Sequence, residues 1–134
     1  MSDQNKTKPV LDLIGRLLLA FIFVFAAIGK IKNYHGTALF MAAHGVPGAL
    51  LPLVIALELL AGLAVMVGIW TRWAALLLAL FSAAAIAIFH HHFATMNEQI
   101  VTLAEASFTG GLLILAAHGP GCLSLDAFWR RKQR

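Results

Sequence analysis

Four long apolar stretches, separated by short polar segments, dominate the pattern along the chain. They cover residues 10–31, 46–70, 73–92 and 98–117. Each is long enough for a helix that crosses the hydrocarbon core of a bilayer, which needs about 20 mostly apolar residues. None of them alternates apolar and polar positions as a membrane β-strand does. We therefore expect an all-α protein, an integral membrane four-helix bundle.

Two shorter segments outside these spans suggest helices that lie at the membrane interface. Residues 33–45 mix large apolar side chains with His35 and His44, which fits either a surface helix or an ordinary connecting loop. Residues 124–134 place three large apolar side chains before four basic residues, a pattern that predicts a second interfacial helix on the inner leaflet.

The composition supports a membrane protein with a single domain. Of 134 residues, 60% are hydrophobic and only 12% are charged, and the spans leave no room for a separate soluble domain. We therefore treat residues 1–134 as one transmembrane domain. Cys122 is the single cysteine, which excludes an intrachain disulfide. The formal charge of +4 does not indicate nucleic acid, because the basic residues flank the spans.

Basic residues gather on one side of the predicted bundle. The opposite side carries only Lys30 and Lys32, whereas the side of the two termini carries Lys6, Lys8, Arg72, Arg130, Arg131, Lys132 and Arg134. The positive-inside rule therefore predicts that both termini, with the basic tail of residues 119–134, face the cytoplasm. The first stretch fits a retained span better than a cleaved signal peptide, because Arg16 lies within it.

Four of the charged residues within the predicted spans are candidates for an intramembrane polar site: Arg16, Lys30, Glu58 and Glu105. A charge in the hydrocarbon core costs at least about 2.5 kcal/mol on insertion scales, so each should face the bundle interior and have a partner. Depth along the helices places Glu58 near the midplane and Arg16 about 7 Å away on the cytoplasmic side. We expect Arg16 to pair with Glu58 and Lys30 to pair with Glu105. These charges either fix helix order or form a ligand or proton site.

Small residues indicate where helices approach one another closely. Gly62 lies four residues after Glu58 and shares its face, so it would let a neighbouring backbone come near. Ala75, Ala79 and Ala83 form a small-residue face on the third span that would permit a homo-oligomer.

Three adjacent histidines, His90, His91 and His92, end the third span. Neighbouring residues on a helix point about 100° apart, so the three cannot all bind one metal ion. A metal site would need help from other side chains on the same side, namely His35, His44 or Glu98. Polar capping at the interface is the favoured interpretation, and we predict no metal site.

The chain also lacks the sequence patterns of self-sufficient catalysis. It has no phosphate-binding glycine loop, no cysteine pair for redox exchange and no Ser-His-acid constellation on a plausible scaffold. We therefore predict no catalytic residue within the chain itself, and at most the role of a subunit in a membrane oxidoreductase.

Short motifs follow one another in a specific order from residue 13 to residue 126. They are Gly15-Arg16, Gly29-Lys30, Gly45-Val46-Pro47-Gly48, Glu58-Leu59-Leu60-Ala61-Gly62, Phe89-His90 with Phe93, Gly110-Gly111-Leu112-Leu113, and Gly119-Pro120-Gly121 followed by Ser124-Leu125-Asp126. In this order and spacing, the chain resembles the DoxX family of small bacterial inner-membrane proteins. The resemblance implies four helices in the cytoplasmic membrane. It also implies a link to quinones, since the family is named after a subunit of a terminal quinol oxidase and thiosulfate:quinone oxidoreductase system.

The chain departs from the family pattern in its fourth span. Members of this type usually have a Lys-Asn pair about six residues before the double glycine, where this chain has Ala104-Glu105. The family lysine would be a natural partner for the glutamate of the second span. Its replacement implies that Arg16 or Lys30 takes that role here, and it adds a second buried acid. His91 and His92 likewise stand where small polar residues are common in the family.

Three functions remain open at this stage. The first is an accessory or anchor subunit of a quinone-linked membrane redox assembly, with an oxidoreductase as partner and quinone as a possible ligand. The second is a small proton-coupled transporter, for which Glu58 would be the membrane-embedded acid. The third is a purely structural or lipid-interacting protein, whose partner is the bilayer itself.

Overall fold

The computed structural model describes residues 2–91 and 93–134, with side chains described from residue 6 onward. Its elements are α1 (Ser2–Lys32), α2 (Tyr34–Ala43), the 3-10 helix η1 (Gly48–Leu50), α3 (Leu51–Val67), α4 (Thr71–Phe89), α5 (Met96–His118) and α6 (Leu125–Lys132). The described residues form no strand, and four of their helices are long and apolar enough to cross a membrane. The prediction of an all-α membrane bundle is confirmed.

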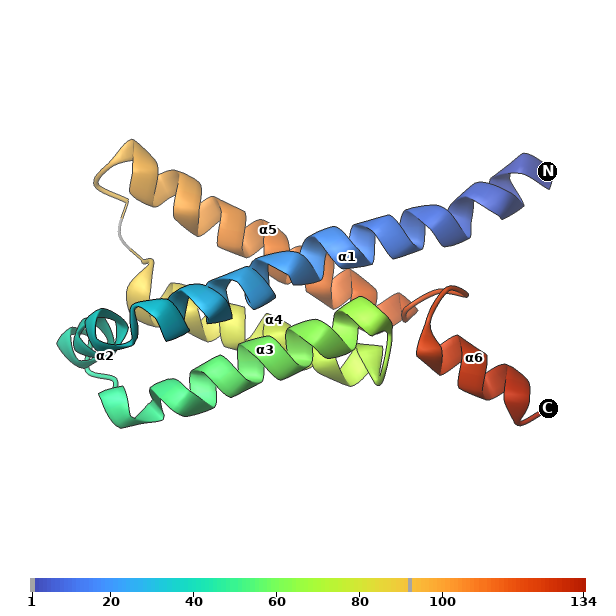
Figure 1. Ribbon diagram of the computed structural model, residues 1–134. Helices are drawn as coiled ribbons and strands as arrows, with labels where there is room; N and C mark the ends of the chain where they lie inside the picture. Colours follow the sequence, from blue (N-terminus) through green and yellow to red (C-terminus); the bar gives the residue numbers. More distant parts are fainter. Residues whose placement is uncertain (1, 92) are drawn as a thin grey trace.

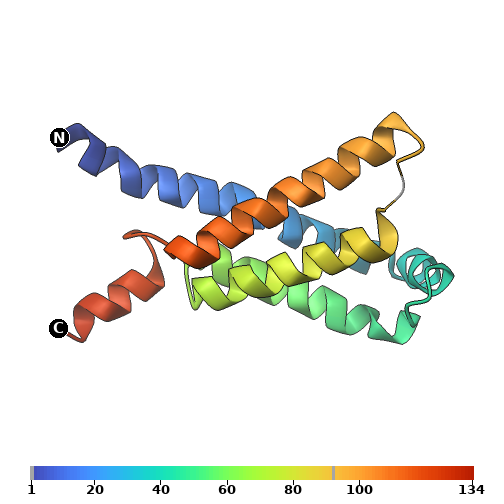
Figure 2. The ribbon, with the colours of Figure 1, turned by 180° about the vertical axis from the view of Figure 1, so that it is seen from behind.

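The long helices form two packed pairs around a central hairpin. α3 and α4 are joined by a tight turn, α1 packs along α3, and α5 packs along α4. α1 and α5 cross each other and then diverge, which gives the bundle an open X shape in both views (Figures 1 and 2). Both termini and α6 lie at one end, which we call the terminal end; α2 and the α4–α5 loop lie at the other, the loop end (Figure 1).

Local chemistry explains where the helices depart from the predicted bounds. α1 begins at Ser2, well before residue 10, because a polar segment can be helical without an apolar signal. The stretch 46–70 is divided: η1 precedes α3, and α3 ends where Gly68 adopts a left-handed φ of +80°. α5 begins at Met96 because Thr95 and Glu98 form a capping box.

The two short segments are both helical. Residues 34–43 form α2, so a plain connecting loop between the first two spans is wrong. α6 begins where the Oγ of Ser124 accepts a hydrogen bond from the backbone N–H of Ala127. The helix ends with three basic residues, as the sequence pattern of the tail predicts.

Small side chains let the helices pack closely in the core. A Cβ at Gly62 would lie 3.1 Å from Val24, which confirms that this glycine allows α1 and α3 to approach. Ala75 and Ala79 are buried against neighbouring helices of the same chain. That part of the alanine face is therefore not available to a second copy, contrary to the prediction, and only Ala83 is exposed.

The outer faces of the long helices are strongly apolar. Large exposed side chains include Leu18, Phe21, Phe25, Leu53, Leu60, Leu80 and Leu103. In water such a surface would be unfavourable, whereas lipid tails solvate it well. The bilayer is thus the natural surrounding of this fold.

Candidate functional site

Lys30 and Glu58 form the ion pair of the bundle interior. The Nζ of Lys30 lies 3.0 Å from Oε1 and 2.8 Å from Oε2 of Glu58, and it joins the end of α1 to the middle of α3. The Glu58 side chain is only 4% exposed. Of the two partners implied by the family resemblance, Lys30 therefore takes the role. The predicted pairs Arg16–Glu58 and Lys30–Glu105 are both wrong.

The direction of side chains along a helix explains the error. A Cα–Cβ bond tilts toward the N-terminus of its helix, so depth along the axis alone misplaces a long side chain. Lys30 and Arg16 both lie on α1 and tilt toward the terminal end, whereas Glu58 tilts toward the start of α3 at the loop end. Lys30 therefore reaches back to Glu58, and Arg16 is directed away from it.

Arg16 instead anchors the loop that follows α5. Its Nη1 donates to the carbonyl oxygen of Pro120 at 2.6 Å and its Nη2 donates to that of Leu123 at 2.8 Å. The residue is 3% exposed, so these bonds are shielded from water. Arg16 is thus a structural tie between α1 and the segment 119–124.

Asp126 fixes α6 on the turn between α3 and α4. Its carboxylate accepts hydrogen bonds from the backbone N–H groups of Trp70 and Thr71, at 2.9 and 3.1 Å, and from the Oγ1 of Thr71. Its own N–H donates to the carbonyl oxygen of Gly68. A carboxylate on the first N–H groups of α4 is favoured by the helix dipole. Sequence reasoning missed this role because the cap lies more than fifty residues from its helix.

His90 and Glu105 form a second polar pair at the loop end. The Nδ1 of His90 lies 2.7 Å from Oε2 of Glu105, and this contact joins the end of α4 to α5. Both side chains are partly exposed, at 33% and 24%. The Oγ1 of Thr102 donates to the carbonyl oxygen of His90 at 2.6 Å, which fixes the backbone of the histidine.

A pocket of about 310 Å³ adjoins this pair, and we call it the histidine pocket. Its lining consists of Phe40, His44, Phe89, His90, Asn97, Glu98, Val101 and Thr102. The rings of Phe40 and Phe89 stack with centroids 5.4 Å apart, and the His44 ring lies 4.4 Å from that of Phe40. The lining thus combines two phenylalanine rings with the imidazoles of His44 and His90. The phenylalanines were missed because each looks like an ordinary apolar residue in its sequence segment.

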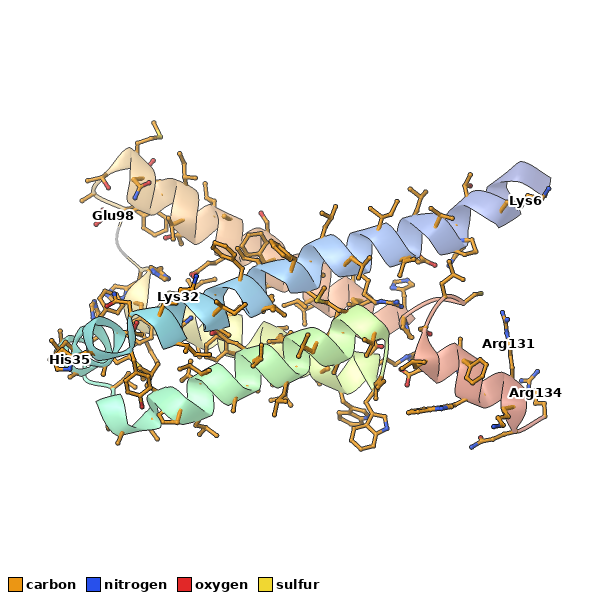
Figure 3. All side chains as sticks on the ribbon, viewed as in Figure 1. Lys6, Lys32, His35, Glu98, Arg131 and Arg134 are labelled. Carbon is orange, nitrogen blue, oxygen red and sulfur yellow. The ribbon has the colours of Figure 1, made fainter. Side chains whose placement is uncertain are left out.

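The other histidines have different positions. His91 is exposed, and His92 lies outside the described residues. Among the described side chains, no group of three histidine, cysteine, aspartate or glutamate residues is close enough to hold a metal ion. In Figure 3, His35 and Glu98 lie at the loop end with Lys32, whereas Lys6, Arg131 and Arg134 lie at the terminal end.

The predicted polar residues therefore belong to separate sites. Arg16 serves the terminal end, Lys30 and Glu58 hold α1 on α3, and Glu105 serves the histidine pocket through His90. Arg16 borders a cavity at the terminal end through Pro120, and Glu105 borders the histidine pocket through His90. Of these two arrangements, only the second brings an imidazole and a carboxylate together beside a cavity, so the histidine pocket is the candidate functional site.

Comparison with known sequences establishes the family. The DoxX sequence model matches residues 11–91, which is more than half of the chain. The chain belongs to the DoxX family. The match includes Arg16, Lys30, Glu58 and His90, whereas Glu105 and the loop after α5 lie beyond it.

Full-length relatives extend the likeness beyond the matched region of this DoxX protein. It is 40% identical to "Inner membrane protein YqjF" of Escherichia coli K12, over 96% of this chain and 98% of the relative. It is 32% identical to "Inner membrane protein YphA" of the same organism, over 92% and 94%. It is 28% identical to "Putative oxidoreductase CatD" of Bacillus subtilis 168, over 92% and 90%. No solved structure is significantly similar to the chain.

Proposed function

We propose that this DoxX protein is an accessory subunit of a quinone-linked redox assembly in the bacterial inner membrane. The observation that carries the proposal is that His90, which lines a pocket with two phenylalanines, contacts the carboxylate of Glu105. Pockets lined by apolar and aromatic side chains with a few placed polar groups are typical sites for small ligands. The name of the Bacillus relative, "Putative oxidoreductase CatD", supports a redox role, and the names of the two Escherichia coli relatives support the inner membrane as its location.

The pair has the chemistry that a quinone head group needs. With Nδ1 bound to Glu105, Nε2 is the ring nitrogen that can meet a ligand. It would accept the hydroxyl proton when quinol is oxidised, and the adjacent carboxylate would stabilise the imidazolium that forms. Oxidation of one quinol releases two protons and two electrons; the imidazole would take one proton, and water at the partly exposed loop end would take the other. The electrons would pass to a redox centre of the partner oxidoreductase.

The proposal includes an orientation. The terminal end carries seven basic residues at the helix ends and in the tail, and the loop end carries Lys30 and Lys32. We propose on this charge difference that the terminal end faces the cytoplasm. The histidine pocket then lies at the opposite membrane surface.

Bound quinone in the purified protein provides the test. We expect protein extracted in mild detergent from bacterial membranes to retain quinone, detected by mass spectrometry after solvent extraction. His90→Gln and Glu105→Gln should each reduce the retained quinone about tenfold, because each removes a charge-assisted hydrogen bond. His35→Gln is the matched control, since His35 is exposed at the same end and does not line the pocket.

Two results would contradict the proposal. Wild-type protein that retains no quinone and co-purifies with no oxidoreductase would favour the purely structural alternative. Proton-coupled flux in liposomes that disappears in Glu58→Gln would favour the transporter. The contact of both Glu58 oxygens with Lys30 gives the transporter no particular support.

A further inference from the structure

The terminal end contains a pocket with an arginine-rich lining, which the redox proposal does not use. The pocket has a volume of about 360 Å³, and we call it the arginine pocket. Its lining is Arg72, His118, Gly119, Pro120, Gly121, Cys122, Ala127, Arg130, Arg131 and Arg134. Four guanidinium groups come from two places in the sequence, the start of α4 and the end of α6, and no acidic residue belongs to the lining.

None of the ion pairs among the described side chains includes a lining arginine, although the Asp126 carboxylate lines an adjoining pocket and the Asp12 carboxylate lies near Gly121. Arg130 donates to the backbone carbonyl oxygen of Asp126, whose carboxylate binds the start of α4. The guanidinium groups are therefore available for an anionic ligand.

The walls of the pocket are held in place by specific contacts. Gly119 and Gly121 have φ of +83° and +81°, and a Cβ on Gly119 would lie 3.1 Å from Nε of Arg72. Glycine at position 119 thus lets the loop approach this guanidinium. Arg16 holds the same loop from the other side, and Asp126 holds the start of α6. The loop and the start of α6 are therefore held beside Arg72, and the four arginines line an open, solvent-exposed pocket.

The adjoining pocket indicates at which depth in the membrane the arginine pocket lies. It shares Arg72, Pro120 and Arg130 with the arginine pocket, and it is lined by Trp70, Trp73 and Trp129, the three tryptophans of the chain. All three side chains are largely exposed. Tryptophan favours the head-group level of a bilayer, so the arginine pocket lies where lipid phosphates are found.

We propose that the arginine pocket binds the phosphate of an anionic phospholipid, with phosphatidylglycerol as the test ligand. Guanidinium groups bind phosphate oxygens in a bidentate manner, and basic pockets beside transmembrane helices are suited to lipid head groups. The tryptophans favour a lipid over a soluble anion, because they place the pocket at the membrane surface. The site would tie α6 and the loop after α5 to one lipid molecule.

Cys122 provides a natural reporter for this pocket. It lines the pocket, it is exposed, and it is the single cysteine of the chain. The full-length protein is placed in nanodiscs of phosphatidylcholine with increasing fractions of phosphatidylglycerol. We expect the rate of Cys122 labelling by the uncharged reagent N-ethylmaleimide to fall as the pocket becomes occupied. Native mass spectrometry should show retained phosphatidylglycerol over the same range.

Charge-matched variants separate this pocket from general attraction to an anionic surface. Arg130→Gln with Arg131→Gln removes two positive charges from the lining, and Lys6→Gln with Lys132→Gln removes two from outside it. The first variant should need at least about tenfold more phosphatidylglycerol for half-maximal protection, because two charge-assisted contacts are lost. The second should behave like the wild type.

The alternative outcomes each overturn the proposal. Equal effects of the two variants would mean general surface attraction, and no protection by phosphatidylglycerol would mean that no lipid site exists. A last experiment replaces phosphatidylglycerol by inorganic phosphate, which is added to the protein in phosphatidylcholine nanodiscs. Protection at millimolar inorganic phosphate as strong as that by the lipid would assign the pocket to a soluble anion. None of these outcomes depends on quinone binding, so the two proposals fail separately.

Discussion

At the scale of single residues, the Lys30–Glu58 pair is the polar contact with the largest expected effect on stability. Both oxygens of the buried Glu58 carboxylate meet the ammonium group of Lys30, whose side chain is 26% exposed. Such a pair adds little to the free energy of unfolding when it is compared with two apolar residues of the same size, because both charges lose hydration on folding. Removing one partner is different, since the other charge then remains buried and unpaired.

This asymmetry predicts the result of a double-mutant cycle. Lys30→Met should lower the free energy of unfolding by about 3–5 kcal/mol, because the Glu58 carboxylate loses its partner. The double variant Lys30→Met with Glu58→Gln should recover most of that loss. The unfolding midpoints of the single and the double variant, measured in mixed detergent micelles, test both expectations. A double variant as unstable as Lys30→Met would show that the ammonium group itself, and not the pairing, holds α1 on α3.

The same residues show where sequence reasoning succeeds and where it stops. Hydropathy alone identifies the four spans. The free-energy cost of a charge in the hydrocarbon core correctly predicts that Arg16, Lys30 and Glu58 are at least partly buried. Their partners could not be derived from depth, because the side-chain direction on each helix decides which groups meet. Arg16 finds backbone carbonyl groups of the loop after α5, and such acceptors leave no trace in a residue pattern.

At the scale of elements, α6 is attached to the bundle mainly through its first residues. Asp126 caps the N-terminus of α4 and Ser124 caps the N-terminus of α6, so one short segment caps the start of two helices. Trp70 has a φ of +46°, an unusual value for a bulky residue, and its N–H is bound by Asp126. The turn between α3 and α4 therefore depends on a contact from the far end of the chain.

Loss of this cap should weaken the bundle and release α6. Asp126→Ala should lower the free energy of unfolding by about 1–2 kcal/mol, because two N–H groups of α4 lose their acceptor. Trypsin should also cleave faster at the arginines of α6. Asp12→Asn is the matched control, since Asp12 forms a partly exposed pair with Lys8, expected to add at most about 1 kcal/mol. Asp126 would not have the capping role if Asp126→Ala and Asp12→Asn lowered the free energy of unfolding equally and were cleaved by trypsin equally fast.

At the scale of the whole molecule, the two ends of the bundle differ in chemistry. The terminal end combines arginines with tryptophans, and the loop end combines histidines with phenylalanines and an acid. The terminal end suits the lipid phosphates of an anionic leaflet. The loop end provides weakly basic imidazole groups in the histidine pocket. A bundle with two such ends can be fixed in orientation by one end while the other meets a small ligand.

Labelling of single cysteines in intact cells tests this orientation. Cys122 lies at the terminal end, so a maleimide that cannot cross the membrane should leave it unlabelled until the cells are opened. His35→Cys in a Cys122→Ser background should be labelled without opening the cells, because residue 35 is exposed at the other end. Both positions are surface positions, so differences in burial do not explain the contrast. The reverse labelling pattern would place the histidine pocket in the cytoplasm, and the basic residues at the terminal end would then have to face the outer leaflet.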